Sequence, residues 1–188
     1  MRYSQIDNKL YVKNRERFKE QMKPDSIAVF FSNDLMPKNA DAFHTFRQNS
    51  DLLYLTGVDQ EESILLMYPD APNGDWKEIL FLRETNERIK IWEGDKLTKE
   101  QGRKTSGIQN VMWTDQFDTI LYQAMGQAKH CYLHLNEHDR YASPADYADA
   151  RYVRQITAKY PLHAYDRSAP IVNVQRSIKS ETEIELIR

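Results

Sequence analysis

The sequence predicts an α/β domain built around one mixed β-sheet. In the first half of the chain, β-prone segments follow one another across short turns, which is typical of antiparallel strands. In the second half, strand and helix patterns alternate, which is typical of parallel strands joined by helices. Because 188 residues suffice for one sizeable core, a single domain is expected.

The first half begins with an amphipathic helix over 6–22, in which apolar residues recur at helical spacing before a proline. An apolar strand is predicted over 26–31, followed by a loop over 33–45 that carries Pro, Asn and Asp. Further strands are expected at 52–56, 63–68 and 78–82. Turn residues at 72–74 separate the last two of these strands.

The second half predicts alternating strands and helices. Thr114 and Ser143 suit the N-caps of two helices, and Pro144 suits a first helical position. Residues 180–183 have the form of a capping box ahead of a short apolar face, so a further helix begins there. The expected elements before it are a strand at 108–113, a helix at 114–127, a strand at 131–135 and a helix at 143–160.

The composition favours a soluble protein that binds neither nucleic acid nor membrane. A formal net charge of −2 at pH 7 lacks the basic footprint of a nucleic-acid binder. No apolar run reaches the roughly 18 residues needed to span a membrane, and the N-terminus has no apolar signal-peptide core. Because Cys131 is the single cysteine, an internal disulfide is excluded, and we expect a cytoplasmic protein.

The run from 46 to 57 is the most informative segment, because it joins a polar loop to an apolar stretch that ends in a turn-forming glycine. Its polar side chains need hydrogen-bond partners wherever they are buried. A capped turn, a buried polar network and part of a functional site are all compatible with this pattern.

Three segments, taken in order, resemble the N-terminal domain of bacterial Xaa-Pro aminopeptidases (aminopeptidase P). They are Phe-Arg-Gln-Asn-Ser-Asp followed by Tyr-Leu-Thr-Gly within 46–57, Ile-Trp-Glu-Gly at 91–94, and Arg-Ser-Ile-Lys-Ser at 176–180. The resemblance implies a creatinase/prolidase-type N-terminal domain, with a mixed six-stranded sheet flanked by helices in a ribonuclease-H-like layout. The signature positions, which we expect to be structural, are Arg47, Gln48, Ser50, Asp51, Gly57 and Gly94.

The same resemblance divides the chain into a domain over 1–175 and the start of a connection over 176–188. That connection would lead into a C-terminal metallopeptidase domain absent from this chain. A short helix at a chain end is marginal unless it packs against something, which also suits a fragment of a longer protein. The alternative is a frayed natural terminus.

No catalytic residue or metal ligand is predicted within the chain. His130, His134 and His138 recur every four residues, but their surroundings are β-prone and then loop-like, so structural or surface roles are favoured over a metal site. No zinc-peptidase, phosphate-loop or serine-hydrolase motif occurs. The resemblance implies two metal ions, usually manganese, in the missing domain, so the isolated chain is expected to hold no cofactor and to be inactive.

Substrate recognition and assembly are the roles left for this chain. Trp92 offers a flat face for a proline ring, and the matching Trp of the family reaches a neighbouring subunit's active site, although anchoring its own loop is an equal alternative. Asp41 matches an acidic residue that lines the oligomeric substrate cleft. Arg47 is expected mainly to brace its loop, through backbone groups or a carboxylate such as Asp51. Residues 95–98 begin with an acid where relatives often carry basic residues, which weakens any anion contact inferred there.

The leading hypothesis is the non-catalytic recognition and oligomerisation domain of an Xaa-Pro aminopeptidase, an enzyme that releases the N-terminal residue preceding proline. Its partners would be a proline-containing peptide and further copies of itself, as a dimer or tetramer. Two alternatives stay open. One is a prolidase, which cleaves Xaa-Pro dipeptides, and the other is a non-catalytic protein-binding module derived from this family.

Overall fold

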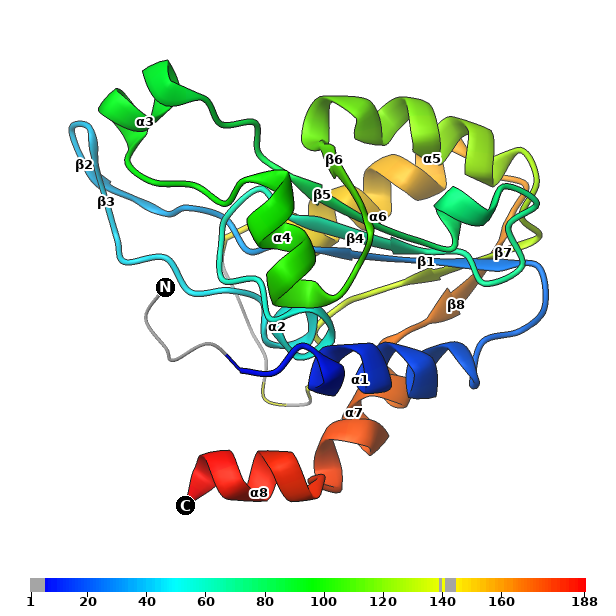
Figure 1. Cartoon of the computed structure of the whole chain (residues 1–188). Coiled ribbons are helices and arrows are strands. Elements are labelled where there is room, and N and C mark those ends of the chain that lie inside the picture. Colours follow the sequence, from blue (N-terminus) through cyan, green and yellow to red (C-terminus); the bar gives the residue numbers. More distant parts are fainter. Residues whose placement is uncertain (1–5, 139, 141–144) are drawn as a thin grey trace.

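A six-stranded mixed sheet forms the centre of the molecule in the computed structural model, with helices on both faces (Figure 1). The structure describes residues 6–138, 140 and 145–188, with the backbone alone at 92 and 93. The strand order is β6-β5-β4-β1-β7-β8. These strands are β1 (Ser26–Phe31), β4 (Ile64–Met67), β5 (Glu78–Leu82), β6 (Asn110–Trp113), β7 (His130–Leu133) and β8 (Ala164–Arg167).

The pairing of the strands confirms the predicted mixture of directions. Strand β4 runs antiparallel to both β1 and β5. Strand β7 is parallel to β1 and β8, and β5 is parallel to β6. Every strand except β4 therefore points its carboxyl end to the same edge of the sheet. All six residues of β1 are buried, as expected for a central strand covered on both faces.

Helices divide between the two faces of the sheet. On one face, α5 and α6 pack Leu121 and Ile156 against Ile27 and Leu66. On the other face, α1, α2, α4 and α7 cover the alternate strand residues (Figure 1). The helices are α1 (Lys9–Lys19), α2 (Ser50–Thr56), α3 (Glu87–Glu93), α4 (Lys99–Ser106), α5 (Phe117–Met125), α6 (Ala148–Lys159), α7 (Ala169–Ser177) and α8 (Glu181–Ile187).

The segment 52–56 is helical, as part of α2, so the predicted strand was wrong. The backbone amides of Asp51 and Leu52 donate to the side chain of Asn49, which caps the helix start. Gly57 ends the helix in the left-handed conformation, with φ of +70°. An apolar run of this length suits a helix or a strand equally, and here the caps at both ends decide for the helix.

Other predicted boundaries also needed correction. The loop over 33–45 contains a small hairpin of β2 (Pro37–Asn39) and β3 (Ala42–Phe43). The predicted loop around 92 forms α3, which Asn86 caps, and α4, β8 and α7 were not predicted. The helix predicted at Thr114 begins as a 3₁₀ turn, with α5 following at Phe117. The predicted caps Ser143 and Pro144 lie outside the described residues, and α6 begins at Ala148.

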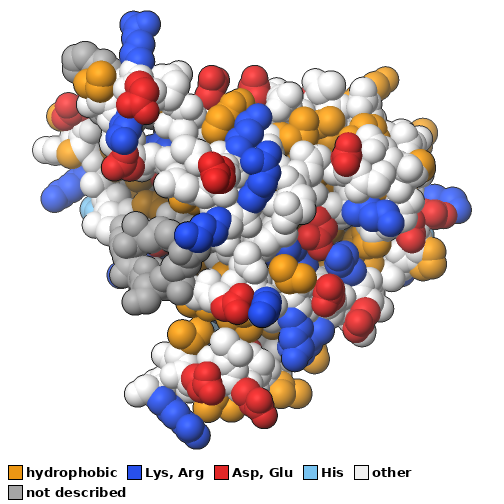
Figure 2. All heavy atoms as spheres, in the orientation of Figure 1, with side chains coloured by type: hydrophobic (Ala, Val, Ile, Leu, Met, Phe, Trp, Pro, Cys, Tyr) orange, Lys and Arg blue, Asp and Glu red, His pale blue; other side chains and the backbone are white. Residues whose placement is uncertain are grey.

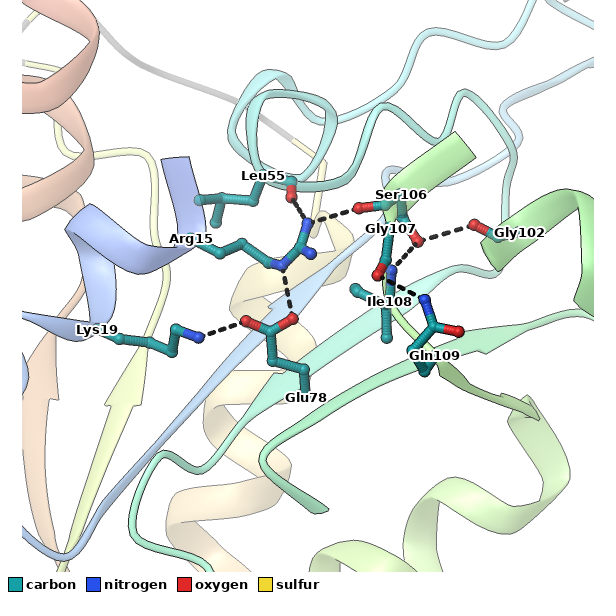
Figure 3. A network of polar contacts seen from close by, with 9 residues as sticks. All are labelled: Arg15, Lys19, Leu55, Glu78, Gly102, Ser106, Gly107, Ile108 and Gln109. Carbon is teal, nitrogen blue, oxygen red and sulfur yellow. Dashed lines mark hydrogen bonds and ion pairs between the residues drawn. The ribbon is translucent and has the colours of Figure 1, made fainter. Parts of the chain in front are cut away.

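A buried arginine ties helix α1 to the rest of its face (Figure 3). The Arg15 Nη1 donates to the carbonyls of Leu55 and Ser106, at 2.7 and 3.0 Å, and Nε donates to Glu78 at 3.1 Å. Lys19 donates to the other Glu78 oxygen at 2.6 Å. Arg15 is fully buried, so these contacts compensate its desolvated charge and join the C-terminal ends of α2 and α4 to strand β5.

The last helix, α8, has the predicted capping box, in which Ser180 and Glu183 bond to each other's backbone amides. Its side chains include exposed apolar ones, which form part of a lower projection of the molecule (Figure 2). No helix in the described part of the chain has both the length and the apolar character that crossing a membrane requires.

Candidate functional site

The candidate site lies where the chain leaves strands β1 and β7. After β1 the chain continues through Asn33 and the hairpin to α2 on one face of the sheet, whereas after β7 it continues to α6 on the opposite face. Such a divergence leaves a crevice at the carboxyl ends of two neighbouring parallel strands. Here the crevice has a volume of about 590 Å³. We call it the switch-point crevice. Its polar lining residues include Asn49, Asp51, His134, Glu137, Asp149 and Arg176.

Asp51 is the centre of the polar network in this crevice. His134 Nε2 lies 2.9 Å from Asp51 Oδ2, and Arg176 donates to Asp51 Oδ1. Burial alone would raise the pKa of Asp51, but the hydrogen bond and charge of His134, together with Arg176, outweigh burial and lower that pKa. Asp51 is therefore an ionised group that joins α2, the end of β7 and the last turn of α7.

Asp149 is a second buried carboxyl group in the same network. The Asn49 side chain donates to Asp149 Oδ2 at 3.0 Å, which joins α6 to the cap of α2. Burial raises the pKa of Asp149 to about 7, with His134 opposing the shift and Asp51 adding to it. The side chain is 3% exposed. Asp149 thus changes charge near neutral pH, unlike the Asp51 carboxylate beside it.

The remaining signature residues shape the loop around this network. Gln48 is buried and donates to the carbonyls of Val58 and Gln60, at 3.1 and 2.8 Å, while its own oxygen accepts from the Asn49 amide. Ser50 is the exposed first residue of α2. A β-carbon at Gly57 would lie 2.3 Å from the ring of Tyr11, so only glycine fits there. The contacts of Gln48 and the close approach of Gly57 to Tyr11 fix the course of the chain on either side of α2.

The predicted recognition residues lie outside the crevice. Asp41 is exposed in the turn between β2 and β3, and Trp92 falls in α3, with its side chain outside the described residues. Gly94 ends that helix with φ of +76°. Because β1 and β5 run in the same direction, the hairpin and α3 both leave the sheet at one edge (Figure 1). Asp41 and Trp92 thus belong to two segments that leave the sheet at the same edge.

Arg47, predicted to brace the loop, is exposed, and its carbonyl accepts a hydrogen bond from Asn33 at 3.0 Å. Asp51, named as a candidate partner for such a brace, bonds to His134 and Arg176. The loop is also held by Gln48 and Asn49, whose side chains make contacts across the sheet edge.

The three regularly spaced histidines lie on β7 and the loop after it, so they do not share a helical face. His130 lies 3.2 Å from Asp166, His134 belongs to the crevice, and His138 accepts from the Arg140 amide at 3.1 Å. Among the described residues, no group of three potential ligand side chains is placed to hold a metal ion. The described chain therefore does not fit a dinuclear metal centre.

Sequence reasoning missed Asp149 and the meeting of His134 and Arg176 at Asp51. Asp51 and Arg176 are separated by 125 residues, and Asn49 and Asp149 by 100 residues. The signal that existed was positional, because His134 directly follows a buried strand and Asn33 follows its parallel neighbour. Only the strand order would have placed these two chain segments side by side.

Comparison with known sequences gives one family model that matches, the aminopeptidase P N-terminal domain, over residues 11–134. The Xaa-Pro aminopeptidase of Escherichia coli K12 is 25% identical over 190 residues, which cover 98% of this chain and 42% of that protein. The intermediate cleaving peptidase 55 of Schizosaccharomyces pombe is 25% identical over 95% of this chain and 37% of its own length.

Solved structures show the same fold. A Bacillus anthracis protein assigned as an aminopeptidase P superposes with a TM-score of 0.85 at 24% identity, over 97% of this chain and 43% of its own. Aminopeptidase P of Pseudomonas aeruginosa gives a TM-score of 0.78 at 23% identity, over 96% and 41%. This chain spans about two fifths of the length of these relatives. Its sequence match over 11–134 places it in the aminopeptidase P N-terminal domain family.

Proposed function

We propose that this chain is the recognition and assembly domain of an Xaa-Pro aminopeptidase. The observation that carries the proposal is its alignment, over 98% of its residues, with 42% of the E. coli enzyme of that name. Proteins of that kind remove an N-terminal residue that precedes proline. The Xaa-Pro bond is a tertiary amide without an N–H, which suits it poorly to ordinary peptidase clefts.

The metal chemistry of such an enzyme would belong to a further domain. Paired metal ions, for which manganese is our expectation, polarise a carbonyl and supply hydroxide when bound. Since the described residues contain no cluster of three ligand side chains, we assign no step of hydrolysis to this chain. Its contribution would be to bind the peptide and to position subunits.

The hairpin and α3 are the part of the chain best suited to that role. Met36 and Phe43 on the hairpin segment and Ile91 on α3 are exposed apolar side chains, and they accompany the two recognition candidates Asp41 and Trp92. Exposed apolar side chains grouped on projecting segments favour a protein interface. We therefore propose that Trp92 lies near a neighbouring subunit's active site in a dimer or tetramer.

The test is an assay of the complete protein that contains this chain, loaded with Mn²⁺. We expect cleavage of Ala-Pro-Ala after the first residue. Cleavage restricted to the dipeptide Ala-Pro would instead identify a prolidase. If neither peptide is cleaved although Mn²⁺ is bound, the protein-binding alternative, which the exposed apolar surfaces also support, takes its place.

A further inference from the structure

We propose that Glu61 is a positioning residue for peptide recognition, because its carboxylate holds the segment that carries Trp92. The inference rests on the proposed role of Trp92 in recognition. Helix α3 projects from the edge of the sheet between strand β5 and helix α4 (Figure 1). A helix of seven residues is marginal by itself, so its place depends on how the chain is held on either side of it.

The chain is fixed shortly after α3 by two buried residues of the loop that follows α2, Gln60 and Glu61. Lys96 donates to the Glu61 carboxylate. The side chains of Lys96 and Glu61 are 15% and 10% exposed, so water and salt screen this ion pair little. The Leu97 amide donates to Gln60 Oε1 at 2.7 Å, and the Leu97 side chain packs against the core of this face. This end of the α3 segment therefore has a defined position.

The next residue of the same loop, Glu62, makes a contact of a different kind. Arg83, which directly follows β5, donates to Glu62 at 3.1 Å, but the Glu62 side chain is 57% exposed. An ion pair so open to solvent contributes little. Of the two ion pairs that this loop makes to the α3 segment, the one between Lys96 and Glu61 is thus the stronger constraint.

The loop that supplies these contacts is itself anchored to the sheet. The side chains of Gln48 and Ser63 both donate to the Gln60 carbonyl, each at 2.8 Å. The Ser63 amide donates to the Ser32 hydroxyl at 3.1 Å, and the Ser32 amide donates to the Ser63 carbonyl at 2.9 Å. Glu61 therefore extends from a frame that the polar run before α2 and the end of β1 hold in place.

The ion pair is close enough to α3 to set the orientation of the helix. Only Gly94 and Asp95 separate the last residue of α3 from Lys96. The Asp95 carboxylate lies 3.0 Å from the Lys90 ammonium of α3, which closes this connecting turn. A buried ion pair is often no more stabilising than an apolar contact of similar size, which favours a role in fixing geometry over a role in overall stability.

The first measurement is hydrogen exchange of the complete protein, followed by mass spectrometry. In Glu61→Gln we expect the amides of α3 to exchange at least about tenfold faster, while those of β1 stay unchanged. Glu62→Gln is the matched control, because it makes the same change at the next residue, whose ion pair is exposed. It should leave α3 unchanged. Unaltered exchange of α3 in Glu61→Gln, or equally faster exchange of β1, would overturn the proposal.

The second measurement is the kinetics of Ala-Pro-Ala cleavage by the complete protein with Mn²⁺. Glu61→Gln should raise KM about fivefold or more and leave kcat unchanged, because it weakens peptide binding without altering the chemical step. Trp92→Ala should also raise KM, and adding Glu61→Gln to it should cause no further rise, since both changes act through α3. A lower kcat at constant KM, additive rises, or a Trp92→Ala variant with unchanged KM would refute the positioning role.

The two measurements fail independently of each other. If no peptide is cleaved, the proposed function fails together with the recognition part of this proposal, whereas hydrogen exchange still decides whether Glu61 holds α3. Lys96→Arg keeps the charge and should resemble the wild type in both measurements. If Glu61→Gln does not fold, Lys96→Met breaks the same ion pair from the side of the α3 segment and is judged by the same outcomes.

Discussion

Single residues fix the geometry of this fold at two places. Gly57 is one, because it combines a left-handed backbone with a ring of Tyr11 placed against its α-carbon. Arg15 is the other, because one guanidinium serves two helix ends and a strand. Both sites are stabilised by contacts between segments far apart in the chain, and both yield predictions about the free energy of unfolding.

Replacing Gly57 by Ala should lower the free energy of unfolding by about 1–3 kcal/mol, since the new methyl group meets Tyr11 and the positive φ is strained. Gly74→Ala is the matched control, because no atom lies within 4 Å of its β-carbon position and its φ is not positive. Urea denaturation followed by circular dichroism measures both. Equal stabilities for the two variants would contradict the assigned role of Gly57.

Replacing Arg15 by Met should lower the free energy of unfolding by about 3–5 kcal/mol, because Glu78 and the carbonyls of Leu55 and Ser106 lose a buried partner (Figure 3). Lys13→Met, at an exposed position of the same helix, should change it by less than about 0.5 kcal/mol. The same urea measurement applies. A cost at Arg15 no greater than at Lys13 would show that the network contributes little.

The Asp149 carboxyl group should make stability depend on pH. Its pKa is raised from 3.8 to about 7 in the folded protein, so the folded state binds the proton more tightly and its contribution is lost as pH rises from about 4 through 7. Relative to wild type, Asp149→Asn should therefore become more favourable by about 4 kcal/mol between pH 4 and pH 8. Urea unfolding at both pH values, with Asp25→Asn as control, tests this. A pH-independent difference would refute the assignment.

At the scale of helices and strands, local signals decided which elements were predictable. Strands β1, β4 and β5 are buried apolar runs and were predicted close to their observed bounds. Strand β8 is partly exposed at the sheet edge and has no apolar run, so nothing local marked it. The segment of α2 was predicted as a strand, because the role of Asn49 as a helix N-cap was not recognised.

The candidate site was predictable to a lesser degree than the fold. The polar run before α2 was compatible with a capped turn, a buried polar network or part of a site, and Gln48, Asn49 and Asp51 form a network that includes the helix cap. Its partners His134 and Asp149 come from β7 and α6, and only the parallel pairing of β1 with β7 brings them to the loop. Long-range pairing of this kind leaves no trace in composition or periodicity.

The Asn49 cap should be worth more than an ordinary helix cap. Asn49→Ala removes the acceptor for two amides of α2 and the donor to Asp149, so we expect a loss of about 1–3 kcal/mol in unfolding free energy. Asn86 caps α3 with the same two-amide geometry but has an exposed environment. Asn86→Ala should cost less than about 1 kcal/mol. Similar losses for both variants would show that the bond to Asp149 adds nothing.

At the scale of the whole molecule, the exposed apolar side chains of the hairpin and α3 project from the carboxyl edge of the sheet, whereas Leu162 is exposed at the amino edge. If the surface formed by the hairpin and α3 joins subunits, a substitution on that surface should alter the assembly without altering the fold. The position of that surface beside the two recognition candidates would then link assembly to peptide binding.

Phe43→Glu in the complete protein should therefore shift the mass measured by light scattering from an oligomer toward a monomer, because a buried charge opposes an apolar interface. Leu162→Glu is the control, because it also replaces an exposed apolar side chain by Glu but lies at the opposite edge of the sheet. It should leave the mass unchanged. A monomeric wild-type protein, or equal behaviour of both variants, would count against an interface at the hairpin.

The network of Arg15 also has a consequence for the order in which the chain is secured during synthesis. The partners of this side chain follow it by 40, 63 and 91 residues. Helix α1 leaves the ribosome early, yet its guanidinium has no complete set of acceptors until Ser106 has emerged. We expect its charge to stay hydrated until then, which would keep α1 from burying this face on a partial sheet. The first helix made would then dock only when more than half of the chain is present.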